Sequence, residues 1–361
     1  MTAAQSAAQS GTRPAAAEAP LPEVSAVVLA YGPEDLLEEC VAALLGSHGV
    51  RIEVVLVDNG CTGDTVERLR GVDGVRLVEP GRNTGFTGGC RLGVAAARSD
   101  VLALVNSDAV VAPGAVAALV RALDDDGVGV VSGSLRLRSR PGVVNSAGNP
   151  VHYLGLSWAG GLGEPAADHA RRAPVASATG GLMALRRGTW DTLGGFHDPL
   201  FAYCEDVELS LRCWQRGLRV EYVPDAVATH AYEFSRNPAK MYLLERNRLA
   251  VVLTVWPART LLVLAPALLG LEAALLVVAL RGGWAGQKVR GWWWLLTRAG
   301  ALVRRRSEVQ AARTAAPGAF HGLLTEAFEP GAETGLRVPR VMTAASRWYW
   351  SAARSLMGVP A

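Results

Sequence analysis

Short apolar segments alternate with amphipathic ones through the first third of the chain, and this alternation constrains the fold more than any other feature. Four apolar segments have the length of buried strands, and the segments between them carry apolar residues at helical spacing. Repeated strand, helix and strand units of this kind build parallel sheets by right-handed crossovers. The sequence therefore predicts an α/β fold with helices on both faces of the sheet. The expected strands are residues 24–30, 52–57, 75–79 and 101–105.

Polar residues follow each of these strands, at the edge of the sheet where parallel α/β folds bind their ligands. Turn chemistry accounts well for Asn59-Gly60, and Asp108 could also cap the next helix or face water. These explanations account less well for Asp58 and Asp108 at the ends of buried strands, because an unpaired buried carboxylate is costly. We therefore expect a ligand at this edge. The residues concerned are Tyr31, Asp58, Asn83 and Asn106-Ser107-Asp108.

The turn before the third expected helix, GRNTGFTGG (81–89), is rich in glycine. It matches neither the dinucleotide-binding nor the Walker fingerprint, so it is only a loose phosphate-binding pattern. Its backbone N–H groups could still bind a diphosphate at the start of the helix.

Two adjacent carboxylates, Glu205 and Asp206, lie at the start of an expected helix in FAYCEDVELSLRCWQRG (201–217). The apolar residues of this segment fall on one helical face, and Gly217 suits its C-terminal cap. Acidic residues in a first turn commonly compensate the helix dipole, which leaves a structural role open. The alternative role is catalytic, because a carboxylate can take a proton from a hydroxyl group that attacks a substrate.

Eight motifs, taken in order, resemble those of the inverting family 2 glycosyltransferases. The resemblance is strongest to the rhamnosyltransferase-like branch, which adds sugars to bacterial cell-surface glycans, and it covers about residues 24–253. It implies a GT-A, Rossmann-like fold with a mixed, mainly parallel sheet and a catalytic domain over residues 22–253. The motifs are VVLAYG, VDNG, GRNTGFTGGCRLG, LVNSD, ATGGLMALRR, LGGFHDPLFAYCEDVELSLRCWQRG, VPDAVATH and ERNRL.

The resemblance also implies a donor site and a metal site. Asp108 and His230 would be ligands of Mg²⁺ or Mn²⁺, a hard cation that neutralises the leaving diphosphate. Asn106 and Arg91 depart from the residues that the family usually has there. The implied donor nucleotide-binding residues are Ala30, Tyr31, Asp58, Asn83, Gly85, Arg91, Asn106 and Ser107.

The same resemblance assigns the carboxylate pair. Asp206 would be the catalytic base that takes the acceptor proton, and Glu205 the acidic residue before it. The implied acceptor-binding residues are Gly180, Gly181, His197 and Asp198, the last two replacing the usual acidic pair.

These assignments predict a metal-dependent inverting glycosyltransferase. It would move a sugar, with rhamnose as the choice that the branch suggests, from a nucleotide-sugar donor to a cell-surface glycan or lipid-linked acceptor. Two alternatives remain at this stage. One is a non-catalytic nucleotide-sugar-binding scaffold, and the other is a nucleotidyltransferase on the same type of sheet. The nucleotidyltransferase alternative gives no role to the Glu205-Asp206 pair.

The two ends of the chain differ from this central part. Residues 1–21 are small and polar, which predicts a disordered leader. Residues 254–361 are predicted to be helical and membrane-associated, because Leu261–Leu280 is apolar over the length of a bilayer core. From residue 281 the chain has twelve Lys or Arg and four Asp or Glu, and seven of its ten tryptophans follow residue 253.

We therefore expect the chain to contact membrane lipid at the cytoplasmic face of the cell membrane. Its five scattered cysteines form no CxxC pair, which agrees with a reducing compartment. The formal net charge of +3 gives no reason to expect nucleic acid as a partner, and the oligomeric state stays open.

Overall fold

The computed structural model describes residues 20–231, 239–329 and 338–358. The predicted leader therefore lies almost wholly outside the described residues. Within them, eight strands form the path of one large sheet, in the order β3-β2-β1-β4-β10-β6-β11-β5. The predicted mixed, mainly parallel sheet is confirmed.

The first half of this sheet is parallel throughout. It comprises β1 (Glu23–Gly32), β2 (Arg51–Cys61), β3 (Val75–Val78) and β4 (Val101–Asn106). Successive residues of a strand face opposite sides, and here both sides are apolar. Val28 of β1 belongs to the core that includes Leu44 of α1, whereas Val27 belongs to the core that includes Val94 of α3. The connecting helices are α1 (Leu37–Leu45), α2 (Thr65–Leu69) and α3 (Gly85–Ala96).

The second half of the sheet is mixed. β10 (Leu182–Arg186) lies antiparallel between β4 and β6 (Val128–Leu137), and β11 (Arg219–His230) runs parallel to β6. The short β5 (Ala109–Val111) pairs antiparallel with the end of β11. The remaining elements of this part are α4 (Ala115–Ala122), β7 (Arg140–Ser146), β8 (Val151–His152), β9 (Ala173–Pro174), α5 (Arg187–Leu193), α6 (Glu205–Gln215) and β12 (Leu324–Thr325).

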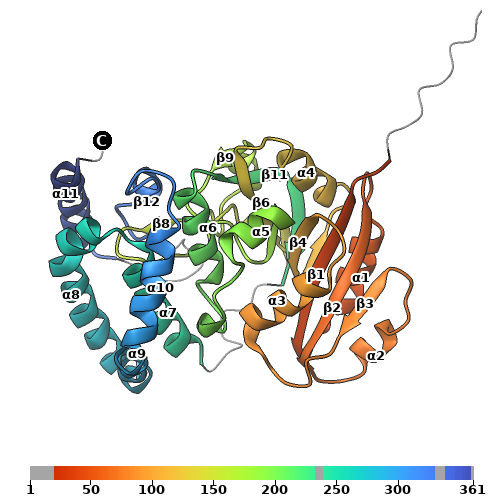
Figure 1. Ribbon diagram of the computed structural model, residues 1–361, viewed down its shortest axis with the longest axis horizontal. Coiled ribbons are helices and arrows are strands. Elements are labelled where there is room, and N and C mark those ends of the chain that lie inside the picture. The colour runs from red at the N-terminus through yellow and green to blue at the C-terminus, as the bar shows by residue number, and fades with distance from the viewer. Residues whose placement is uncertain (1–19, 232–238, 330–337, 359–361) are drawn as a thin grey trace, which may run out of the picture.

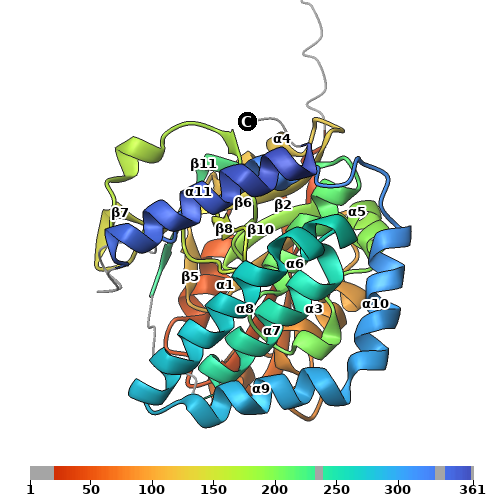
Figure 2. The ribbon, with the colours of Figure 1, turned by 90° about the vertical axis from the view of Figure 1, so that its left-hand side faces the viewer.

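Five helices, α7 to α11, cover one end of the molecule, away from β2 and β3 (Figure 1 and Figure 2). Trp256, which is fully buried, donates its indole N–H to the carbonyl of Tyr153 at 3.1 Å. Trp350 stacks on the ring of the same Tyr153, with ring centroids 4.9 Å apart. The packing therefore continues across the predicted domain boundary at residue 253, which stays a prediction. The helices are α7 (Lys240–Val255), α8 (Ala258–Arg281), α9 (Ala285–Thr297), α10 (Ala299–Ala311) and α11 (Arg340–Met357).

A buried cluster of charges joins α7, α8 and α9. Lys288 of α9 is fully buried, and its Nζ lies 2.5 Å from Glu245 of α7 and 3.0 Å from Glu272 of α8. Arg248 of α7 also pairs with Glu272. Because each buried charge has an opposite charge beside it, the cluster is electrostatically balanced. Glu272, the one acidic residue in the apolar helix, thereby fixes α8 to its neighbours.

The outer face of α8 is apolar and exposed. Within the described residues, α8 is the one helix long and apolar enough to cross a membrane, and only 6% of its most apolar stretch is buried. Leu262 and Leu269 of α8, Trp293 of α9 and Trp348 of α11 are each more than 60% exposed. A surface of this kind marks an interaction site in soluble proteins and at membranes.

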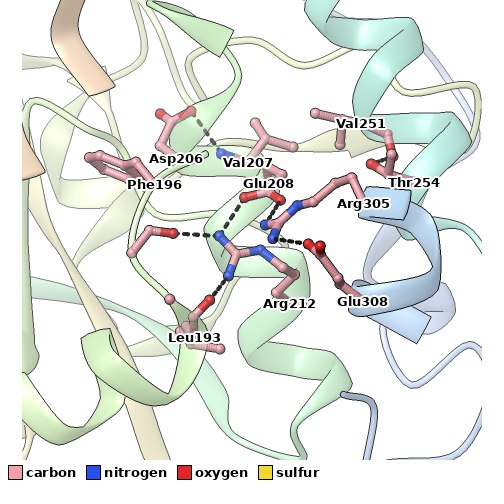
Figure 3. A network of polar contacts seen from close by, with 12 residues as sticks. Leu193, Phe196, Asp206, Val207, Glu208, Arg212, Val251, Thr254, Arg305 and Glu308 are labelled. Carbon is pink, nitrogen blue, oxygen red and sulfur yellow. Dashed lines mark hydrogen bonds and ion pairs between the residues drawn. The ribbon is translucent and has the colours of Figure 1, made fainter. Parts of the chain in front are cut away.

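A buried carboxylate, Glu208 of α6, connects this helical end to the sheet domain (Figure 3). Its two oxygens accept hydrogen bonds from Arg212 of α6 at 2.5 Å and from Arg305 of α10 at 2.7 Å. Arg212 also donates to the carbonyls of Leu193 and Gly195. Burial by itself would raise the pKa of Glu208, but the two guanidinium groups hold that pKa below its usual range.

We predict that Arg305→Ala destabilises the whole protein, because it leaves one oxygen of the buried Glu208 carboxylate unpaired. The expected loss in the free energy of unfolding is about 2–3 kcal/mol. Urea unfolding followed by tryptophan fluorescence measures it. Arg304→Ala removes an exposed arginine from the same helix and should change that free energy by less than about 0.5 kcal/mol. Equal effects of the two substitutions would contradict this role of Arg305.

Candidate active site

Asp108 and His230, the two predicted metal ligands, lie side by side. His230 Nε2 is 3.1 Å from Asp108 Oδ1. The sheet produces this contact, because β11 pairs with β5 so that His230 stands opposite Ala109, the residue after Asp108. Asp108 and His230 are 122 positions apart in the sequence, and the strand register brings them into contact.

A second contact orients the His230 ring. Its Nδ1 lies 2.9 Å from Asn145 Oδ1, a buried amide oxygen on β7. If the ring proton is assigned to Nδ1, it is donated to Asn145, and Nε2 faces Asp108 with its electron pair. Asn106 Nδ2 lies 3.4 Å from Nε2 and is the natural donor to that electron pair. Sequence reasoning missed Asn145, since no motif marks it.

The polar residues that follow β1 and β2 lie next to each other. Ala30 stands opposite Asp58 in the register of the two strands. Asp58 Oδ1 accepts the N–H groups of Gly60 and Cys61 at 3.1 and 2.9 Å, which fixes the carboxylate in a turn and leaves it further acceptor capacity. Tyr31 is exposed and beside Gly60. The geometry thus gathers three of the predicted donor residues at one place.

Three backbone N–H groups of the glycine-rich turn bond other groups of the protein. The N–H of Thr84 donates to Asn59 Oδ1 at 2.8 Å, and that of Gly85 donates to Asn83 Oδ1 at 2.8 Å. The N–H of Thr87 donates to the carbonyl of Phe201 at 3.1 Å. In this arrangement these groups are not free for the expected diphosphate. Asn83 therefore shapes the turn, together with the buried Asn59, which sequence reasoning assigned to turn chemistry.

Gly85 cannot carry a side chain in this turn. Its φ is +74°, and a Cβ there would lie 2.4 Å from the carbonyl oxygen of Phe201. The start of α3 therefore packs directly against the segment that leads into α6.

The guanidinium group of Arg91, which is predicted to contact the donor nucleotide, bonds the segment between α5 and α6. Its Nε lies 3.0 Å from Asp198 Oδ1, and its Nη1 donates to the carbonyls of Gly194 and Phe196. The guanidinium group therefore ties the predicted acceptor segment to α3. Next to it, burial lowers the pKa of His197 to about 4, so this imidazole is neutral at physiological pH.

Asp206 has the hydrogen bonds of a stable carboxylate. Its Oδ2 accepts from the N–H of Gly180 at 3.0 Å and from Asn149 Nδ2 at 3.1 Å, and its Oδ1 accepts from the N–H of Val207 at 2.8 Å. Burial raises the pKa of Asp206, and these donors oppose that effect. Nothing in the sequence pattern pointed to Asn149.

Glu205 lies in a different environment. The residue is buried, and its Oε2 has no hydrogen-bond partner. Burial first, and the neighbouring charge of Asp206 second, raise the pKa of Glu205 above its usual range. Of the two adjacent acids, Glu205 is therefore the one that holds a proton.

Three left-handed residues precede this pair. Phe201, Tyr203 and Cys204 have φ values of 66°, 70° and 66°, which are unfavourable for residues with a side chain. Asn247 of α7 compensates by donating its side-chain N–H groups to carbonyls of this segment, including Ala202 and Tyr203 at 2.8 Å. The ERNRL motif thus holds the entry to α6, a role that its sequence did not reveal.

Gly180 and Gly181 connect the two halves of the site. The N–H of Gly180 bonds Asp206, and the carbonyl of the next residue, Gly181, accepts the N–H of Asn106 at 3.0 Å. Consecutive Cα atoms are about 3.8 Å apart, so these contacts bring Asp206 close to the end of β4. A Cβ on Gly181 would lie 2.7 Å from Leu135 and 3.5 Å from Asn106 Nδ2, so the close approach needs glycine.

The donor set of Asp108 and His230 fits a divalent cation that takes its other ligands from substrate. Asp108 Oδ1 and His230 Nε2 lie 3.1 Å apart, close enough to bind one cation together, and Asn145 orients the imidazole. Within residues 20–231, 239–329 and 338–358, no group of three or more His, Cys, Asp or Glu side chains could hold a metal ion. Mg²⁺ and Mn²⁺ bind with few protein ligands when diphosphate oxygens and water complete the shell.

Comparison with known proteins agrees with this geometry. A family described as "Glycosyltransferase like family 2" matches residues 22–253. N-acetylglucosaminyl-diphospho-decaprenol L-rhamnosyltransferase of Mycobacterium tuberculosis is 28% identical over 245 residues, which cover 59% of this chain and 78% of that protein. The probable glycosyltransferase YdaM of Bacillus subtilis is 24% identical over 240 residues, which cover 64% of this chain and 55% of that protein.

A solved structure shows the fold. GalNAc-T7, crystallised with UDP, GalNAc and Mn²⁺, has a TM-score of 0.55 at 19% identity, and the match covers 66% of this chain and 49% of that chain. The family match spans more than half of this chain. This protein therefore belongs to the family 2 glycosyltransferases and has a GT-A fold.

Proposed function

We propose that the protein is an inverting, metal-dependent glycosyltransferase that acts on a lipid-linked acceptor at the membrane. The observation that carries this proposal is the bridge formed by Gly180 and Gly181. It joins the carboxylate of Asp206 to Asn106, whose side chain contacts His230 beside Asp108. A sugar between these groups would have a base on one side and the leaving diphosphate on the other.

Asp206 is the proposed catalytic base. Inversion requires a carboxylate opposite the leaving group that accepts the proton of the attacking hydroxyl. Three N–H donors favour the ionised form of Asp206 and oppose burial, which still leaves its pKa raised. The neighbouring Glu205, whose Oε2 has no hydrogen-bond partner, is the acid that we propose keeps its proton. Because Glu205 is neutral, it does not repel the negative charge of Asp206.

Asp108 and His230 are the proposed metal ligands. When bound, a divalent cation supplies positive charge at the oxygens of the leaving diphosphate. The ring of His230, oriented through Asn145, and the carboxylate of Asp108 position that charge. Asp58, Tyr31 and Ala30 are the proposed contacts to the nucleoside, because they gather at the ends of β1 and β2.

The substrates are proposed from the mycobacterial relative. Its name gives L-rhamnose as the sugar and N-acetylglucosaminyl-diphospho-decaprenol as the acceptor. We infer that this chain transfers a deoxyhexose of that class to a sugar carried on a polyprenyl diphosphate. The product would be used in a cell-surface polysaccharide.

Membrane contact is proposed for the exposed face of α8, α9 and α11. The ion pairs of Glu272 with Arg248 and Lys288 hold α8 against α7 and α9, so α8 could cross a bilayer only by breaking them. An in-plane position keeps these pairs and still covers the exposed leucines of α8. The catalytic domain then lies on the cytoplasmic face, where nucleotide sugars are found.

Asp206→Asn tests the base. The amide keeps the size of the side chain but cannot accept a proton, so transfer should fall by about 10² to 10⁴. The measurement is transfer by purified protein from a panel of nucleotide sugars to a polyprenyl-diphosphate-linked acceptor, with Mg²⁺ or Mn²⁺ present. Donor affinity should stay unchanged, which separates this role from a binding role. A loss of donor affinity with unchanged turnover would reassign Asp206.

Asp108→Asn is the matched second variant in this experiment. It should lose the metal-dependent part of donor binding while keeping the fold, because one metal ligand is weakened. Full turnover of this variant with either cation would remove Asp108 from the proposed metal site.

Glu205→Gln tests whether Glu205 is protonated in the folded protein, through the pH dependence of thermal stability. A buried acid with a raised pKa stabilises the fold below its unfolded-state pKa, near 4.5, and loses that contribution as pH rises through the folded pKa. The amide mimics the protonated acid and does not titrate. Thermal unfolding should therefore show the variant gaining stability relative to the wild type between about pH 5 and pH 9. A constant difference over this range would contradict the assignment.

Membrane contact is tested by sedimentation. The full-length protein should sediment with membranes and should resist release by salt. Salt screens interactions between charges but does not weaken the burial of apolar side chains in the membrane. Leu262→Glu combined with Leu269→Glu places two charges on the exposed face of α8 and should move the protein to the supernatant. Retention of this variant on membranes would show that another surface makes the contact.

A further inference from the structure

A pocket lies between α7 and α9, beside the segment that leads into α6. Its volume is about 460 Å³, and an adjoining pocket of about 260 Å³ shares four of its lining residues. Neither pocket contains the proposed base, metal ligands or nucleoside contacts. The residues that matter here are Asp198, Tyr242, Arg246, Arg290, Trp294 and Arg298.

Three arginines of this pocket lie against two aromatic rings. Arg246 packs over Trp294 at 4.4 Å and over Tyr242 at 5.1 Å. Arg290 covers the ring of Tyr242 at 4.5 Å, and Arg298 covers that of Trp294 at 5.0 Å. Stacking of this kind holds guanidinium groups in fixed planes. The N–H groups of Arg246 are donated to Asn247, Pro199 and Leu200, so Arg290 and Arg298 are the arginines that can bind a ligand.

No acidic side chain balances these arginines in the part of the chain that the structure describes. Arg246, Arg290 and Arg298 have no carboxylate partner there. The one carboxylate in the lining, Asp198, is paired with Arg91 at 3.0 Å. Arg246 is buried, and burial together with the charges of Arg298 and Arg290 lowers its pKa. An anion in the pocket would relieve this repulsion.

The surroundings of the pocket point to an anion that carries a hydrocarbon chain. Trp293, which lines the smaller pocket, is 65% exposed, and Leu296 on the same helix is 70% exposed. Exposed tryptophan and leucine beside arginine are typical of the boundary between lipid headgroups and acyl chains. A ligand with a diphosphate and a polyprenyl tail matches both parts of this surface.

The pocket is also connected to the base. Arg246 Nη2 donates to the carbonyls of Pro199 and Leu200 at 3.0 and 2.7 Å. These residues belong to the segment that runs through Phe201 into α6, where Asp206 lies. A ligand held by Arg290 and Arg298 would therefore lie beside this segment, which includes the predicted acceptor residue Asp198.

We propose that this pocket binds the diphosphate of the lipid-linked acceptor, with Arg290 and Arg298 as its contacts and the tail along Trp293 and Leu296. The inference rests on the proposed function, since it concerns the acceptor of that reaction. Planar guanidinium groups bind phosphate oxygens in pairs, which suits a diphosphate better than a single carboxylate.

The test is binding to phosphatidylcholine vesicles that contain a polyprenyl-diphosphate-linked N-acetylglucosamine. Charge-matched vesicles with phosphatidylglycerol are the second arm. The double variant R290Q/R298Q should lose about tenfold or more of its affinity for the first vesicles and little for the second, while its affinity for the nucleotide sugar stays unchanged. R281Q/R304Q removes two exposed arginines of the same helical end and should leave the preference for the diphosphate lipid intact.

Each other outcome overturns the proposal. An equal loss on both kinds of vesicle would show that the arginines bind anionic lipid in general. Unchanged binding to the diphosphate vesicles would place the acceptor elsewhere. Because vesicle binding requires no transfer, a failure here leaves the transferase reaction to be judged by the Asp206→Asn experiment alone, and an inactive enzyme leaves the binding result valid.

Discussion

The burial of Glu208 is the constraint on which the arrangement of the active site depends. A carboxylate in the interior needs hydrogen-bonding or oppositely charged partners, and Arg212 and Arg305 supply a positive charge at each oxygen of Glu208 from two different helices. Arg212 in turn bonds the carbonyls that end α5, so α5, α6 and α10 meet at one point (Figure 3). The proposed base, Asp206, lies in the first turn of the same helix, two residues before Glu208. Its position therefore depends on helices that lie beyond the matched family region.

The helical end of the chain thus contributes to the ion pairs and the core of the sheet domain. Its charges reach the catalytic helix through Arg305, and its aromatic residues complete the core around Tyr153. Its outer face is apolar, and its basic pocket opens beside the segment with three left-handed residues. Under the proposed function, the same group of helices would bind a lipid and position the loop that precedes the proposed base.

Much of this was predictable from the sequence, because its signals are local. The period of the apolar residues gave the parallel strands, and the polar residue after each strand marked Asp58 and Asp108. The ordered motifs, through a family resemblance, added Asp206 and His230. What the sequence could not give depends on tertiary register. Asn145 and Asn149 lie in segments without a motif, and only the pairing of strands and the approach of α6 bring them to His230 and Asp206. Arg91 was predicted to contact the donor nucleotide, and the N–H groups of the glycine-rich turn a diphosphate. Arg91 instead bonds carbonyls of residues 194–196, and the N–H groups of Thr84, Gly85 and Thr87 bond Asn59, Asn83 and Phe201.

The central claim is that a single carboxylate acts as base opposite the leaving diphosphate, and the stereochemistry of the product tests it most directly. Nuclear magnetic resonance of the purified glycoside gives the configuration at the transferred anomeric carbon. Direct displacement assisted by Asp206 predicts a configuration opposite to that of the nucleotide-sugar donor. A product with the configuration of the donor retained would contradict the account, because retention requires a different sequence of steps from the one this geometry supports.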